Sequence, residues 1–144
     1  DQFFWRDDGG SNAADLAELV ESRGLSAGLL GNPVEEEFIP QTGIIETDNQ
    51  GNFVRIIEKP KLEEAPSNLN NSSFYVLNKE IFELARTLPA NPKRGEFELT
   101  DAINAYIDGG GVIVVGEAKG EYMECGSPSG WLKANNAMAK NATL

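Results

Sequence analysis

Two apolar runs that do not alternate with polar residues constrain the fold of this chain most. They are LSAGLLGNPV, residues 25–34, and VIVVGEA, residues 112–118. A strand with one face in water shows alternating polarity, so a continuous apolar run predicts a strand buried on both faces. Segments with the apolar spacing of amphipathic helices separate these runs. Strands of this kind alternating with helices predict an α/β fold.

The first predicted helix lies between two predicted strands. Residues 1–5 have the composition of a strand end, and residues 25–34 form the next strand. Between them the sequence predicts a helix over residues 13–23, with Asn12 as its N-cap and Gly24 as its stop. A strand, helix, strand order at this length predicts a parallel βαβ unit.

Three further helices are predicted from apolar spacing and capping residues. Asn78 is placed to cap a helix over residues 79–88, and Thr100 to cap a helix over residues 101–110. A last helix is predicted over residues 131–141. The side chains of the first of these helices that are expected to face the core are Ile81, Phe82, Leu84 and Ala85.

Residues 42–60 predict a β-hairpin, because two strand-like runs flank the turn 48–51, in which Gly51 supplies a positive φ. A loop over residues 62–71 is expected to lead into a strand over residues 72–77. No internal repeat or second domain is evident, so residues 1–144 are predicted to form one domain.

Charge and composition exclude several classes of function. Twenty-three acidic residues against 12 basic ones leave a formal charge of −11, which repels nucleic acid and anionic membranes. No apolar run approaches the ~20 residues of a membrane span, and the first residues do not resemble a signal peptide. Cys125 is the single cysteine, which fits a reducing cytoplasm. We therefore expect a cytoplasmic protein without nucleic-acid or membrane partners.

The chain contains no histidine, so any catalysis must rely on carboxylates, lysine or a metal held by oxygen ligands. The strongest candidate residues are Glu58 and Lys59, which precede Pro60 at the end of a predicted strand. Pro60 is expected to keep Lys59 extended, at the strand end where α/β sheets bind ligands. There a carboxylate can bind sugar hydroxyls and an ammonium can bind a phosphate. The alternative is an edge strand with two solvated charges.

Four motifs identify a family resemblance. GIIETDNQGNFVRIIEKPKLEEAPSNL, followed by FYVL, GEFELTDAI and ECGSPSGWLKAN, resembles the sugar-1-phosphate nucleotidyltransferases. The likeness is greatest to UTP–glucose-1-phosphate uridylyltransferases. It implies a Rossmann-like mixed sheet with flanking helices and an enzyme that joins a sugar 1-phosphate to a nucleoside triphosphate.

The resemblance also implies roles for individual residues. Glu58 would hold the sugar hydroxyls, Lys59 would contact the sugar phosphate, and the backbone of Gly43 would approach the sugar. Asp1 and Glu124 would bind Mg²⁺ as hard oxygen ligands at a shared carboxyl edge of the sheet. Glu124 stands where relatives usually have aspartate.

Two departures from the family pattern qualify this prediction. Relatives have a small apolar stretch where this chain has residues 70–73, NNSS, so its sugar preference could differ. The glycine-rich basic loop that binds the triphosphate is absent from these 144 residues. We therefore interpret the chain as the sugar-phosphate portion of a nucleotidyltransferase, inactive alone. A sugar-phosphate-binding or regulatory module, a thymidylyl- or guanylyl-transferring relative and a homo-oligomer all remain open.

Overall fold

The computed structural model of the chain describes residues 2–91 and 95–141. The strands are β1 (Gln2–Trp5), β2 (Gly28–Pro33), β3 (Gly43–Thr47), β4 (Phe53–Glu58), β5 (Leu69–Val76), β6 (Val114–Glu117) and β7 (Glu121–Glu124). The α-helices are α1 (Asn12–Ser22), α2 (Lys79–Thr87), α3 (Leu99–Asp108) and α4 (Pro128–Asn141). Two short 3₁₀ segments, Glu36–Gln41 and Leu62–Glu64, precede β3 and β5.

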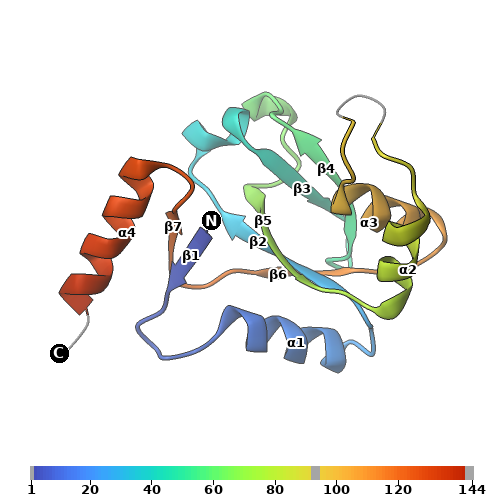
Figure 1. Cartoon of the computed structure of the whole chain (residues 1–144), viewed down its shortest axis with the longest axis horizontal. Helices are drawn as coiled ribbons and strands as arrows, with labels where there is room; N and C mark the ends of the chain where they lie inside the picture. The colour runs from blue at the N-terminus through green and yellow to red at the C-terminus, as the bar shows by residue number, and fades with distance from the viewer. Residues whose placement is uncertain (1, 92–94, 142–144) are drawn as a thin grey trace.

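The main sheet has five strands in the order β4-β3-β5-β2-β6. Only β2 and β6 run parallel, and the remaining neighbours are antiparallel. Helix α1 runs along the sheet in Figure 1, while α2 and α3 lie together on the right of the view. This mixed sheet with flanking helices confirms the predicted α/β fold class.

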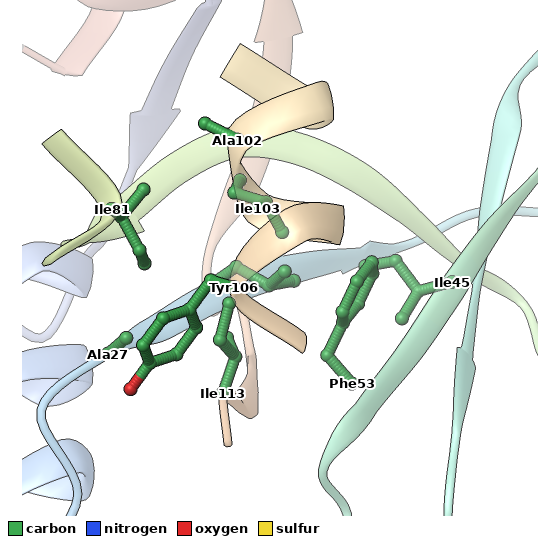
Figure 2. Close-up of a cluster of buried hydrophobic side chains, with 9 residues drawn as sticks. Ala27, Ile45, Phe53, Ile81, Ala102, Ile103, Tyr106 and Ile113 are labelled. Atoms are coloured by element: carbon green, nitrogen blue, oxygen red, sulfur yellow. The ribbon is translucent and has the colours of Figure 1, made fainter. Parts of the chain in front are cut away.

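Two apolar clusters hold the helices on the sheet. Leu29 and Leu30 are consecutive in β2, so their side chains leave opposite faces of the sheet. Leu30 packs with Leu16 and Val20 of α1. Leu29 belongs to the larger cluster of Figure 2, which includes Ile81 of α2 and residues of α3. The remaining members of the larger cluster are Ala27, Ile45, Phe53, Ala102, Ile103, Tyr106 and Ile113.

The predicted parallel βαβ unit at the start of the chain is wrong. Strand β1 pairs antiparallel with β7 in a separate two-stranded sheet, with Gln2 opposite Glu124 and Trp5 opposite Glu121. The parallel neighbour of β2 is β6. Strand β7 is too short for its four residues to show a strand pattern, so the sequence did not reveal the partner of β1.

Capping differs from the prediction at two of three helices. Ser11, rather than Asn12, caps α1, and its hydroxyl accepts a hydrogen bond from the backbone of Ala14 at 3.4 Å. Helix α3 begins at Leu99 with Glu98 at its N-cap position, so Thr100 lies inside the helix. The prediction for α2 is confirmed, because the Asn78 side chain accepts from the backbone of Ile81 at 3.0 Å.

The predicted hairpin is present, and its turn has the expected chemistry. Gly51 has φ +77° and donates its backbone N–H to the carbonyl of Asp48 at 3.0 Å. Phe82, in contrast, is 55% exposed and does not face the core as predicted. Val112 precedes β6 and is exposed, and β6 itself is an edge strand in which Val115 and Glu117 are not buried, so the run 112–118 is not buried on both faces as predicted. None of the described helices is long and apolar enough to cross a membrane.

Candidate functional site

A cavity of about 440 Å³ lies between the main sheet and α3, and we call it the first cavity. Its size is within the range of small-molecule sites. Apolar side chains and polar groups that can exchange hydrogen bonds with a ligand line it together. The lining residues are Leu29, Gly43, Phe53, Arg55, Ile56, Glu58, Asn71, Tyr75, Glu98, Thr100, Ile103 and Asn104.

Strands β3 and β4 bring two of the predicted site residues together in this cavity. Gly43 is paired directly with Glu58 across the two strands. A β-carbon at Gly43 would lie 3.0 Å from Oε2 of Glu58 and 2.8 Å from Cγ2 of Ile56. The close approach explains why this position needs a glycine. It also leaves the Gly43 backbone open to a ligand bound beside the Glu58 carboxylate.

Lys59 follows Glu58, but it is not extended as predicted. Its φ is +48°, in the left-handed region that non-glycine residues rarely adopt, and its backbone N–H donates to the carbonyl of Thr42 at 3.0 Å. Pro60 is buried and thereby anchors the end of the strand. The Lys59 side chain is exposed, and among the described residues it forms no ion pair. Strained backbone of this kind is often found at functional sites.

A second strained residue lies in β5, between Asn71 and Tyr75, which both line the first cavity. Ser73 in β5 has φ +54°, and its backbone N–H donates to Oδ1 of Asn71 at 3.1 Å. The Tyr75 hydroxyl accepts from Nδ2 of Asn71 at 2.9 Å. The sequence marked Asn71 only as part of a departure from the family. Residues four apart in a strand share a face, but the predicted strand began at residue 72, so Asn71 fell in the predicted loop and its position beside Tyr75 was missed.

Glu124 lies elsewhere, in a second cavity of about 780 Å³ beside α4. Its Oε2 accepts a hydrogen bond from the Ser127 hydroxyl at 2.8 Å, which lowers the pKa of the Glu124 carboxyl below its ordinary value. The carboxylate is therefore ionised at neutral pH. The other lining residues include Thr42, Asn70 and Lys133.

Asp1 and Glu124 are the predicted Mg²⁺ ligands, and the strand pairing at Glu124 shows which residue lies opposite it. Asp1 lies outside the described residues. The next residue, Gln2, begins β1 opposite Glu124. Gln2 and Glu124 approach each other because their strands are antiparallel, not because two strands end at one carboxyl edge.

The chemistry of the Glu124 region fits a hard cation. Within the described part of the chain, Oε1 of Gln2 is buried without a hydrogen-bond partner, and it lies on the strand residue paired with Glu124. An amide oxygen and a carboxylate are both ligands that Mg²⁺ accepts. No group of three or more acidic or cysteine side chains able to hold a metal occurs among the residues described. Besides Glu124 and Gln2, the remaining oxygen ligands of a cation would therefore have to come from Asp1 or a bound phosphate.

The two cavities adjoin the same pair of segments. Asn70 lines the second cavity and Asn71 the first, and consecutive residues of a strand point to opposite faces. Thr42 and Gly43 divide between the cavities in the same way. The structure thus brings Gly43 and Glu58 together at the first cavity, with Lys59 next in the chain but not among the lining residues, and it places Glu124 at the second cavity.

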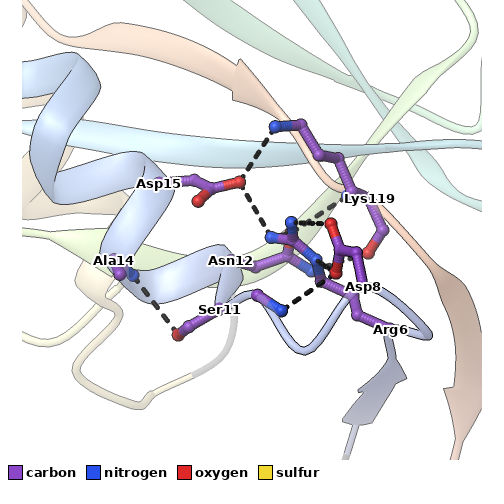
Figure 3. A network of polar contacts seen from close by, with 8 residues as sticks. Arg6, Asp8, Ser11, Asn12, Ala14, Asp15 and Lys119 are labelled. Carbon is purple, nitrogen blue, oxygen red and sulfur yellow. Dashed lines mark hydrogen bonds and ion pairs between the residues drawn. The ribbon is translucent and has the colours of Figure 1, made fainter.

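A polar network that the sequence did not predict fixes the loop after β1. The Arg6 guanidinium, with a side chain only 8% exposed, binds Asp8 at 2.6 Å and Asp15 at 2.8 Å. Lys119, in the loop between β6 and β7, adds a second ion pair to Asp15 at 3.0 Å. The side chain of Asn12 donates to and accepts from the Lys119 backbone. Figure 3 shows these contacts joining the β1 exit, the start of α1 and the β7 entry.

Comparison with known proteins decides the family. A family model described as nucleotidyl transferase matches residues 10–141. The chain belongs to the nucleotidyl transferase family. This confirms the resemblance seen in its motifs.

Individual relatives support the assignment. The chain is 35% identical over 130 residues to the low-salt glycan biosynthesis nucleotidyltransferase of Haloferax volcanii, covering 90% of this chain and 35% of that protein. It is 40% identical over 87 residues to the UTP–glucose-1-phosphate uridylyltransferase of Pseudomonas aeruginosa, covering 60% of this chain and 30% of that protein.

A solved structure agrees in fold. The UTP-bound UGPase from Acinetobacter baumannii matches with a TM-score of 0.82 and 26% identity, over 99% of this nucleotidyl transferase chain and 49% of that structure. The chain therefore spans about a third of these sequence relatives and half of the solved structure.

Proposed function

We propose that this chain is the sugar-phosphate-binding portion of an enzyme that joins UTP and glucose 1-phosphate to give a nucleotide-sugar and pyrophosphate. The 144 residues alone are proposed to be inactive, because they contain no glycine-rich basic loop to bind a triphosphate. The named activity of the Pseudomonas relative supports the choice of UTP and glucose.

The observation that carries the proposal is the pairing of Gly43 with Glu58 at the first cavity, with Lys59 next in the chain. The Glu58 carboxylate has no hydrogen-bond partner among the described residues, so its oxygens are available to sugar hydroxyls. The exposed Lys59 side chain follows Glu58 directly, and its ammonium is the proposed contact of the sugar phosphate. Gly43 leaves room for the sugar ring against the backbone.

The reaction requires little acid–base chemistry from the protein. An oxygen of the sugar 1-phosphate attacks the α-phosphorus of the nucleoside triphosphate, a new P–O bond forms, and pyrophosphate leaves. The nucleophile is already an anion, so no general base is needed, which agrees with a chain that has no histidine. Glu58 orients the sugar and Lys59 neutralises phosphate charge, so the rate comes from positioning and electrostatics.

Glu124 and Asp1 are the proposed ligands of Mg²⁺, with Gln2 beside them. When bound, Mg²⁺ would neutralise charge on the reacting phosphates. The ionised carboxylate of Glu124 suits this role, and the Ser127 hydroxyl holds it in place.

A second candidate is a non-catalytic sugar-phosphate-binding or regulatory module. The same cavity would serve it, since sugar binding needs only Gly43, Glu58 and Lys59. A longer reading frame that carries a glycine-rich basic loop would favour the transferase. A longer frame without such a loop would favour the module.

The test is a titration of the purified chain with glucose 1-phosphate, glucose and inorganic phosphate, followed by amide NMR. We expect glucose 1-phosphate to bind at least tenfold more tightly than either fragment, with shifts at Gly43 and Glu58. Glu58→Gln should weaken it by about tenfold, the scale of a charge-assisted hydrogen bond. The matched control is Glu63→Gln, an exposed glutamate outside both cavities. Equal effects of the two variants, or no binding of the sugar phosphate, would contradict the proposal.

A further inference from the structure

The small sheet formed by β1 and β7 carries Glu124, yet it is only two strands wide. A two-stranded sheet is marginally stable by itself in water. A slip of one residue between the strands would turn the side chain of Glu124 away from that of Gln2, because neighbouring residues of a strand point to opposite faces. The position of Glu124 therefore depends on contacts that fix the register of this sheet from outside it.

Such contacts lie at the end of the sheet remote from Glu124. Trp5 ends β1, and Arg6 follows directly. All three guanidinium nitrogens of Arg6 are in use. Nε and Nη2 donate to the Asp8 carboxylate at 2.9 and 2.6 Å, and Nη1 donates to Asp15 of α1 at 2.8 Å. Because the Arg6 side chain is only 8% exposed, these two carboxylates fix its direction with little competition from water.

The same network holds the loop that leads into β7. Lys119 donates from Nζ to Asp15 at 3.0 Å, and its backbone N–H and C=O both bond the buried amide of Asn12, at 3.0 and 2.9 Å. Gly120 has φ +91°, and a β-carbon there would overlap the carbonyl oxygen of Trp5. One carboxylate oxygen of Asp15 thus binds the exit of β1 and the entry of β7 together, as Figure 3 shows.

The register set at this end of the sheet determines which residues meet at the other end. Trp5 is paired with Glu121, so Gln2, three residues earlier, is paired with Glu124, three residues later. At about 3.4 Å per residue, the two ends lie roughly 10 Å apart. Arg6 therefore acts on the Glu124 carboxylate through the strands and not by contact.

Aromatic contacts attach the small sheet but specify its register less. Phe4 lies against Tyr122 with ring centroids 5.4 Å apart, and against Phe74 of β5 with centroids 6.3 Å apart. Burial of apolar surface is non-directional, whereas each hydrogen bond of the Arg6 network joins two particular atoms. The aromatic rings thus hold the sheet against β5, and the Arg6 network selects one register.

We propose that Arg6 is a positioning residue for the cation site. Together with Asp15 and Lys119, it fixes the register of β1 against β7 and thereby places the Glu124 carboxylate opposite Gln2. This inference rests on the proposed function, since it takes Glu124 as a ligand of Mg²⁺. Removal of outer groups that orient metal ligands typically weakens metal binding by about 10- to 100-fold.

The experiment measures register and cation affinity separately in the purified chain. Cross-strand NOEs between Gln2 and Glu124 report the register without a cation, and a Mn²⁺ titration followed by broadening at Ser127 reports the affinity. Arg6→Gln should lose these NOEs and bind Mn²⁺ about tenfold more weakly. NOEs between Gly43 and Glu58 in the main sheet should persist.

Further variants separate positioning from stability. Asp15→Asn keeps the Arg6–Asp8 pair but weakens the link to α1 and Lys119, so it should also lose the NOEs and weaken Mn²⁺ binding, even if Arg6→Gln does not fold. Arg6→Lys keeps the charge and should restore part of the affinity. Ser11→Ala, the matched control, removes the cap of α1 without touching the network and should leave NOEs and affinity unchanged.

The outcomes distinguish this inference from the proposed function. If Arg6→Gln or Asp15→Asn loses the NOEs but keeps the affinity, or keeps both, the positioning role is overturned while the proposed function stands. The role is also overturned if Ser11→Ala weakens Mn²⁺ binding as much as they do. If wild type binds no Mn²⁺ near Glu124, the proposed metal ligands fail and this inference fails with them, while the titration with glucose 1-phosphate still tests the sugar-phosphate site.

Discussion

Gly43 faces Glu58 across β3 and β4 so closely that a β-carbon at position 43 would lie 3.0 Å from the Glu58 carboxylate oxygen. Gly43→Ala should therefore push Glu58 and Ile56 aside, because the added methyl would also lie 2.8 Å from Ile56. We expect a loss of about 1 kcal/mol in the free energy of unfolding and at least tenfold weaker binding of glucose 1-phosphate. Gly109→Ala is the control, since its β-carbon would meet only ordinary contacts at 3.4 Å.

Two substitutions of Lys59 distinguish its effect on ligand affinity from its effect on the free energy of unfolding. Its left-handed backbone is strained, so Lys59→Gly should raise the free energy of unfolding by about 1 kcal/mol while removing the phosphate contact. Lys59→Ala should keep the strain and also lose the contact. Both variants should bind glucose 1-phosphate at least tenfold more weakly, whereas the exposed Lys61→Ala should not. Unchanged affinity in the Lys59 variants would make this residue a solvated charge at a strand end.

Glu124 should mark the cation site. Mn²⁺ added to the purified chain should broaden the amide signals of Gln2, Glu124 and Ser127 more than that of Gly43, because Gln2 is paired with Glu124. Glu124→Gln should reduce this broadening, since an amide oxygen binds the cation more weakly than a carboxylate. Glu121→Gln, at the other end of β7, is the control. Broadening that persists in Glu124→Gln would contradict the assignment.

Acid should weaken the Arg6 network. Hydrogen bonds from Arg6 and Lys119 hold the pKa of Asp15 below its usual 3.8, and the Arg6 hydrogen bond lowers the pKa of Asp8 to about 2. Because these folded-state pKa values are depressed, the stabilisation is present above about pH 4 and is lost as the pH falls toward about 2. Asp15→Asn should lower stability at neutral pH and flatten its pH dependence in this range, measured by urea unfolding. Asp108→Asn, an exposed helix-end variant, should leave the slope unchanged.

The start of α1 offers a direct comparison of two neighbouring polar residues. Ser11→Ala removes the helix cap and should lower the free energy of unfolding by about 1 kcal/mol. Asn12→Ala leaves the Lys119 backbone N–H and C=O without the buried side chain that bonds both, so it should be more damaging, about 2 kcal/mol. Thermal unfolding of both variants measures the order. The opposite order would mean that the capping contact outweighs the link between α1 and the β6–β7 loop.

Local sequence determined the elements whose signals are complete within a few residues. The Asp48–Gly51 turn, the Asn78 cap and the buried apolar run of β2 formed as predicted, because turn chemistry, capping and continuous hydrophobicity are short-range properties. The turn at residues 48–51 also accounts for the pairing of β3 with β4, whereas the grouping of Gly43, Glu58 and Lys59 came from the family resemblance and not from local pattern.

Tertiary structure alone decided the relationships that join distant segments. The pairing of β1 with β7 places Gln2 opposite Glu124 and joins residues more than 100 positions apart in the chain. The four residues of each strand carry too little pattern to predict which strand they pair with. Lys59 adopted a positive φ because its N–H bonds the Thr42 carbonyl, which outweighed the extended preference that Pro60 predicts. Asn71 and Tyr75 came to share a cavity with Glu58 only because β5 packs beside β3. Residue type established what these side chains can do chemically, and long-range packing determined which of them meet.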